Sequence, residues 1–114
     1  VFLNTGVTPD CVICNNDSMA LGIIDACKEE NIDLDKLPVL GIDATANGCE
    51  AIENGDMAFT VYQSGKGQGT AAVEAAAHLA NGESVGSMDG VTDDGKYVWV
   101  PFEKVDKSNV SDYK

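Results

Sequence analysis

The segment DCVICNNDSMALGIIDACKE, from Asp10 to Glu29, joins a short apolar run, a polar corner and a helical pattern. The apolar run covers residues 11–14, and Asn15-Asn16-Asp17 interrupts it. Residues 18–27 then carry apolar side chains at helical spacing, with Asp17 or Ser18 as the expected N-cap. A buried strand that turns sharply into a helix is half of a βαβ unit, so the segment predicts an α/β fold.

The order of apolar run, polar residue and helix recurs further along the chain. The later repeats are expected as strands over 38–42 and 57–62, closed by Asp43 and Gln63, and as a helix over 44–54 with Thr45 as its cap and Gly55 as its stop. Strands that alternate with helices in this way predict a doubly wound, mainly parallel sheet.

The second half of the chain has a different pattern. It predicts an Ala-rich helix over 70–80, a polar loop over 83–95, an apolar strand over 97–101 and a short helix within 108–114. Three parts follow: residues 1–63 with the three repeats, residues 64–95 with the long helix and its loop, and residues 96–114 with the closing strand and tail. Residues 1–6 are typical of a last helical turn ending at Gly6, which predicts that the chain is a piece of a longer protein.

Length and charge restrict the class of protein. A chain of 114 residues suits one small domain, and 44% hydrophobic residues are typical of a globular one. The net charge of −12, with only seven Lys and Arg residues, argues against a nucleic-acid partner. Because no apolar run approaches the roughly 18 residues of a membrane span, direct membrane insertion is not expected either.

The cysteines and glycines do not predict a metal or cofactor site. Cys11 and Cys14 lie within a strand pattern, whereas redox and zinc motifs need a helix N-terminus or a second ligand pair, so all four cysteines are expected as buried apolar residues. Gly65-x-Gly67-x-Gly69 lacks the spacing of a dinucleotide or phosphate loop. We predict no cofactor and no metal.

Polar side chains close each of the three expected strands. They are the corner Asn15-Asn16-Asp17, then Asp43, then Gln63. Because parallel strands of one sheet end on the same edge, these side chains should line one crevice. Carboxylate and amide groups bind neighbouring hydroxyls of a sugar as acceptors and donors, and no nucleophile with an adjacent base lies at these strand ends. The pattern favours polyol binding and predicts no enzyme activity.

Each of these residues also has a purely structural interpretation. Asp17 would serve as a helix cap or corner residue. Asp43 would hold the loop after its strand in an Asx-turn, and Gln63 would be an exposed turn amide. Their shared position at strand ends, rather than any one residue, favours the ligand-binding interpretation.

Three blocks carry a family resemblance: VICNNDSMALG at residues 12–22, VLGIDAT at 39–45 and GDMAFTVYQ at 55–63. In this order and spacing they resemble the C-terminal portion of periplasmic sugar-binding proteins of ABC transporters, and within that family the galactose/glucose-binding branch. KYVWVPF at residues 96–102 is similar to the closing strand of that branch.

The resemblance implies a type I periplasmic-binding fold in which a monosaccharide lies between two lobes. It also implies that the protein is located outside the cytoplasm and passes the sugar to a permease in the membrane. Residues 1–63 would be part of the C-terminal lobe, and residues 64–95 would pack on the N-terminal lobe. The residues that match the family's sugar contacts are Asn16, Asp43 and Gln63. The galactose/glucose branch usually has Asn where Gln63 stands, whereas Ala44 after Asp43 is similar to the hexose branch.

Two further expectations come with the resemblance. The effector-sensing domain of a lactose-repressor-type transcription regulator shares this fold and is the alternative function. In the family fold, further strands precede the part that residues 1–114 match. Without those strands, a strand edge and apolar helix faces would be uncovered, so self-association through exposed edges is expected.

Overall fold

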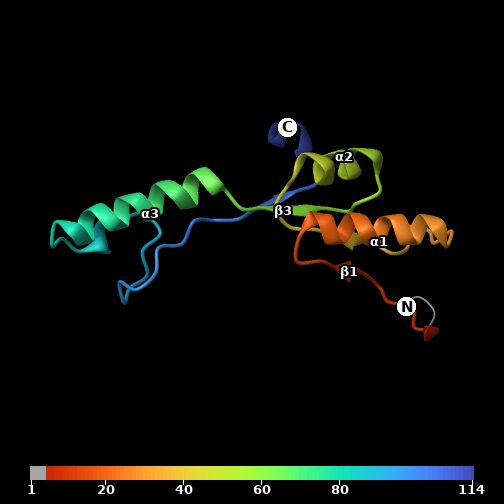
Figure 1. Cartoon of the computed structure of the whole chain (residues 1–114), viewed down its shortest axis with the longest axis horizontal. Helices are drawn as coiled ribbons and strands as arrows, with labels where there is room; N and C mark the ends of the chain where they lie inside the picture. The colour runs from red at the N-terminus through yellow and green to blue at the C-terminus, as the bar shows by residue number, and fades with distance from the viewer. Residues whose placement is uncertain (1–4) are drawn as a thin grey trace. The chain divides into compact units, whose positions relative to one another are not determined.

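The computed structural model describes residues 5–114 and contains three helices, four short strands and two short 3-10 helices within that range (Figure 1). In chain order they are β1 (Val12–Ile13), α1 (Asp17–Glu29), β2 (Val39–Leu40), α2 (Ala46–Asn54), β3 (Thr60–Tyr62), α3 (Gly65–Ala80), η2 (Val85–Ser87), β4 (Glu103–Val105) and η3 (Val110–Tyr113). They divide into two compact units. The first contains the described residues up to Tyr62 together with Glu103–Lys114, and the second is Gln63–Phe102.

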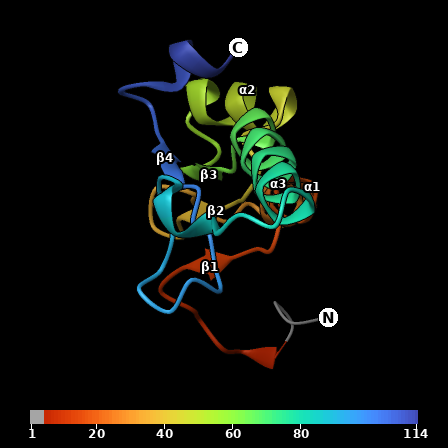
Figure 2. The same ribbon diagram turned by 90° about the vertical axis from the view of Figure 1, so that its left-hand side faces the viewer.

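The strands of the first unit lie in the order β1, β2, β3, β4 (Figure 2). β1 pairs with β2 in parallel, with Val12 opposite Val39, and a parallel bridge joins Leu40 to Phe59 beside β3. β4 pairs with β3 antiparallel, with Thr60 opposite Val105. The expected parallel arrangement of the first three strands is therefore confirmed, and the sheet is mainly parallel.

The helices of the first unit begin and end where short-range signals place them, with one exception. Thr45 caps α2 by accepting the Gly48 N–H at 3.1 Å, and Gly55 ends it in a left-handed conformation, as expected. The exception is α1, whose cap is Asn16 rather than Asp17 or Ser18. Of the expected helix end over residues 1–6, residues 1–4 lie outside the described part of the chain.

The core of the first unit gathers apolar residues from all three repeats and the tail. Its buried members are Cys14, Ala20, Ile24, Val39, Cys49, Ala51, Ile52, Met57, Val105 and Val110. Cys27 is also buried, so burial is confirmed for three cysteines, but Cys11 is exposed. Cys11 precedes β1 and therefore lies outside the paired part of the strand.

The second unit departs from the sequence prediction in two places. α3 begins at Gly65, five residues before the expected Thr70, because Ser64 caps it by accepting the Gly67 N–H at 3.0 Å. The expected strand over 97–101 does not form: its pairing is one bridge between Val98 and Val91, and the strand of this region is β4. Residues 96–102 belong to the second unit, and Glu103–Lys114 belong to the first.

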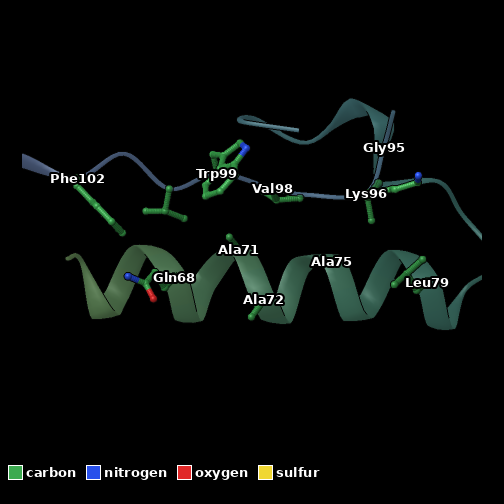
Figure 3. A pocket seen from close by; sticks show the side chains of 12 residues that line it. Gln68, Ala71, Ala72, Ala75, Leu79, Gly95, Lys96, Val98, Trp99 and Phe102 are labelled. Carbon is green, nitrogen blue, oxygen red and sulfur yellow. The ribbon is translucent and has the colours of Figure 1, made fainter. Parts of the chain in front are cut away.

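The run 97–101 lies beside α3, and an apolar groove of about 530 Å³ is lined by residues of both (Figure 3). Val98 and Trp99 line this groove from the run, and Ala71 and Ala75 line it from α3. Because Pro101 has no N–H to donate, the run is also a poor partner for a continuous strand ladder. Trp99 remains 65% exposed and stacks on Tyr97 with ring centroids 6.0 Å apart.

Candidate functional site

The corner between β1 and α1 presents Asn16. Its backbone is extended, and its Oδ1 accepts the Met19 N–H at 2.9 Å, which satisfies one of the unpaired donors of the helix start. Asn16 therefore has the structural role that the sequence assigned to its neighbours. The cap uses Oδ1, and the Nδ2 donor pair takes no part in it.

Asp17, the next residue, is fully buried and does not face the solvent. Its Oδ2 accepts from the Thr45 N–H at 2.7 Å and from the Thr45 hydroxyl at 2.9 Å. Its Oδ1 accepts from the Thr60 hydroxyl at 2.6 Å. The carboxylate thus joins the start of α1 to the start of α2 and to β3, and its role in this structure is structural.

Two glycines make room for this carboxylate. A Cβ at Gly41 would lie 2.2 Å from Asp17 Oδ1, and a Cβ at Gly48 would lie 2.2 Å from Oδ2. Real Cβ atoms do not approach oxygen this closely, so a side chain at either position would displace the carboxylate. The backbone therefore encloses Asp17 from both sides.

Asp43 follows β2 on a turn with unusual backbone angles. Its φ is 110° and that of Ala44 is 50°, both in the region that favours glycine. Such conformations cost about 1–3 kcal/mol per residue and persist where the surroundings determine them, often at functional sites. Asp43 itself is exposed, so the turn presents a carboxylate at the end of a strand.

Hydrogen bonds continue across the sheet edge beyond the ends of the strands. The Asp17 N–H donates to the Ile42 carbonyl at 2.8 Å, and the Asp43 N–H donates to the Val61 carbonyl at 2.8 Å. These bonds bring the corner with Asn16 and the turn with Asp43 onto one edge of the first unit. Gln63 directly follows β3 in the chain, is half-buried, and is the first residue of the second unit.

Sequence reasoning missed the connecting role of two threonines. Thr45 was expected only as the cap of α2, and Thr60 was not singled out, yet both donate to Asp17. A signal for Thr60 was present, because it is a polar residue within the apolar run 57–62, and buried hydroxyls need a partner.

The Cys49 thiol lies within the electrostatic influence of Asp17. Burial raises the pKa of Cys49, and the negative charge of Asp17 raises it further, so the thiol stays protonated at neutral pH. Within residues 5–114, no three His, Cys, Asp or Glu side chains gather in a way that could hold a metal ion. Likewise, none of the helices described is both long and apolar enough to cross a membrane.

Comparison with known proteins places the chain in a family. Residues 2–84 match the family model described as periplasmic binding protein domain. A Rhizobium meliloti protein named for rhizopine binding is 34% identical over 99% of this chain and 34% of its own length. The D-galactose/methyl-galactoside binding periplasmic protein MglB of Haemophilus influenzae is 35% identical over 91% of this chain and 30% of its own length. The chain therefore spans about a third of the length of these relatives.

Solved structures give the same result for the fold. A solute-binding protein of an ABC transporter from Bacillus halodurans, with bound myo-inositol, is 40% identical with a TM-score of 0.76, over 98% of this chain and 35% of that chain. A periplasmic solute-binding protein from Actinobacillus succinogenes, with bound D-allose, is 26% identical with a TM-score of 0.77, over 98% of this chain and 36% of that chain. The fold is thus a partial α/β domain of the type I periplasmic-binding class, and the chain belongs to the periplasmic binding protein domain family.

Proposed function

We propose that the chain forms one wall of a sugar site in the solute-binding protein of an ABC importer, and that Asn16, Asp43 and Gln63 contact the sugar. The observation that carries the proposal is the exposed carboxylate of Asp43, held on a turn with positive φ at the end of a parallel strand and next to the corner with Asn16. The names and bound ligands of the relatives support it, because these proteins bind galactosides, myo-inositol or D-allose.

The three side chains supply complementary groups for vicinal hydroxyls. Asp43 accepts hydrogen bonds from two hydroxyls, Asn16 donates through Nδ2, and the Gln63 amide does both. Hydrogen bonds to a charged group contribute about 1.5–3 kcal/mol each, so Asp43 should contribute most to the affinity.

Galactose or glucose is the ligand that we propose first. The identity with the galactoside-binding relative and Ala44 after Asp43 support a hexose. A second candidate is myo-inositol, a six-membered ring with hydroxyls on every carbon, because the solute-binding protein that holds it is 40% identical to this chain.

The partner and the location follow from the same proposal. The protein would be located outside the cytoplasm, would deliver its sugar to the permease of an ABC importer and would catalyse no reaction. The comparisons do not favour the alternative of a lactose-repressor-type regulator, since the relatives named above are binding proteins of the periplasm or of transporters.

Isothermal titration calorimetry of the full-length gene product tests the proposal. We expect micromolar or tighter binding of galactose, glucose or myo-inositol. Asp43→Asn should weaken it about 10- to 100-fold, the equivalent of losing one charge-assisted hydrogen bond. Asp25→Asn, which removes a carboxylate from an exposed position of α1, is the matched control and should bind like the wild type.

The isolated 114-residue chain offers a second measurement. Because it supplies one wall of the site, we expect its affinity to be at least about 100-fold weaker than that of the full-length product. Absence of sugar binding by the full-length product, or unchanged affinity in Asp43→Asn, would contradict the proposal.

A further inference from the structure

We propose that Asp17 is the positioning residue of the sugar site: its buried carboxylate holds the turn at Asp43 in the conformation that aims Asp43 at the ligand. This inference rests on the proposed function. According to this inference, Asp17 affects sugar binding without touching the sugar.

The first step is that three successive backbone N–H groups of the turn are fixed from outside it. The Asp43 N–H donates to the Val61 carbonyl at 2.8 Å, the Ala44 N–H to the Thr60 hydroxyl at 3.3 Å, and the Thr45 N–H to Asp17 Oδ2 at 2.7 Å. Two of these three acceptors depend on Asp17, because the Thr60 hydroxyl is itself oriented by donating to Asp17 Oδ1 at 2.6 Å.

The second step is that the turn needs this support. Neither Asp43 nor Ala44 is a glycine, yet their φ values are 110° and 50°. Residues in such conformations return to ordinary backbone angles unless the surrounding contacts oppose it. Without Asp17, only the bond from the Asp43 N–H to Val61 would remain of the three contacts described above.

The third step is that Asp17 cannot shift to release the turn gradually. The backbone at Gly41 and Gly48 approaches its two carboxylate oxygens so closely that a Cβ at either position would lie 2.2 Å away. The turn is therefore held by a carboxylate that is itself closely enclosed, on the buried side of the sheet edge.

Asn is the informative replacement for Asp17, because it keeps the shape and loses one acceptor. If its oxygen faces Thr45, its amide must donate to the Thr60 oxygen, which already receives the Ala44 N–H, and the Thr60 hydrogen loses its acceptor. If the amide faces Thr45 instead, it meets two donors. Either orientation breaks at least one hydrogen bond of the network that holds the turn: the bond that orients the Thr60 hydroxyl, or the bonds that Thr45 donates.

A double-mutant cycle on the full-length gene product separates positioning from general stability. With D-galactose and myo-inositol as probes, Asp17→Asn should weaken binding at least tenfold in the wild-type background. In an Asp43→Ala background it should weaken binding less than twofold, because the group that it positions is already absent. Equal losses in both backgrounds would overturn the inference.

Thr60 provides a second pair of variants in case Asp17→Asn folds poorly. Thr60→Val removes the hydroxyl between Asp17 and Ala44 at constant shape and should weaken binding about fivefold. Thr60→Ser keeps the hydroxyl and should bind within twofold of the wild type. Equal affinities of the two variants would contradict the role of this contact.

A measurement without ligand distinguishes failure of this inference from failure of the proposed function. NMR couplings that report φ should show positive φ at Asp43 and Ala44 in the wild type and a change at both in Asp17→Asn. If the wild type binds neither sugar, the proposed function fails, and unchanged couplings in Asp17→Asn then overturn the positioning role as well. If sugar binds but the couplings or the cycle show no link to Asp17, the proposed function stands and this inference fails.

Discussion

Alanine substitution of two glycines in neighbouring helices should have opposite effects on stability. In an ordinary helix interior, Gly→Ala stabilises by about 1 kcal/mol because Ala loses less backbone entropy on folding. Gly22 in α1 has open space around its Cα, so Gly22→Ala should show this gain. Gly48 in α2 does not, because a new Cβ there would lie 2.2 Å from Asp17 Oδ2.

The cost at Gly48 follows from the bonds at that oxygen. Asp17 Oδ2 accepts both the N–H and the hydroxyl of Thr45, and the backbone at Gly41 lies close to Oδ1 on the other side. Two hydrogen bonds to a charged group are worth about 3–6 kcal/mol. Subtracting about 1 kcal/mol for the helix propensity of Ala leaves a net destabilisation of about 2–5 kcal/mol.

Urea and thermal unfolding followed by circular dichroism measure both effects. We expect a lower melting temperature for Gly48→Ala by about 8–20 °C, at about 4 °C per kcal/mol for a domain of this size, and a small rise for Gly22→Ala. In an Asp17→Ala background, Gly48→Ala should lower the free energy of unfolding much less, because the carboxylate that its Cβ would displace is absent. A Gly48→Ala variant at least as stable as the wild type would refute the enclosed carboxylate.

Three further predictions concern other parts of the chain. The hydrogen bond from the Tyr113 hydroxyl to Glu103 at 2.6 Å raises the pKa of Tyr113 to about 12, so its stabilising effect should persist below about pH 10 and disappear as the pH rises towards 12. An absorbance titration should show this late tyrosinate, and Tyr113→Phe should abolish it. In native protein, Cys11 should react with a thiol reagent while the other three thiols, whose pKa is raised by burial, react only on unfolding; equal rates for all four would contradict their burial. Finally, Ile13 is 75% exposed on β1, which pairs with β2 alone in the described residues, so the isolated chain should self-associate in light scattering, and Ile13→Lys should reduce this; a monomer at all concentrations would refute it.

Much of the first unit was predictable because its signals are local. A short apolar run, a polar interruption and an apolar helical pattern lie within about 20 residues in each repeat. Thr45 and Gly55 mark the ends of α2 by residue type alone. The parallel arrangement follows from the alternation of strand and helix, and it predicts the shared edge to which hydrogen bonds bring the corner with Asn16 and the turn with Asp43.

The errors occur where distant contacts decide between local options. Asn16 and Asp17 are equally good caps by residue type. Asp17 does not cap α1 because its carboxylate oxygens accept hydrogen bonds from Thr45 and Thr60, which lie 28 and 43 residues further along the chain. β4 was missed because Glu103 and Lys104 have no strand-like apolar pattern, and the strand forms through pairing with β3. The apolar run 97–101 is expected as a strand, whereas Val98, Trp99 and Val100 line a groove beside α3.

The hydrogen bonds of Asp17, which short-range sequence signals do not predict, also connect the fold to the proposed site. A carboxylate with three donors around it is a strong structural element, and here its donors are the residue after the Asp43–Ala44 turn and a hydroxyl that holds Ala44. Asn16 has a structural role at the same edge, because its Oδ1 caps the start of α1, and we propose its Nδ2 as a donor to the sugar. If the proposed function is correct, stability and sugar binding at this edge depend on shared hydrogen bonds. Substitutions that loosen the buried side should then change both, whereas exposed substitutions such as Asp25→Asn should change neither.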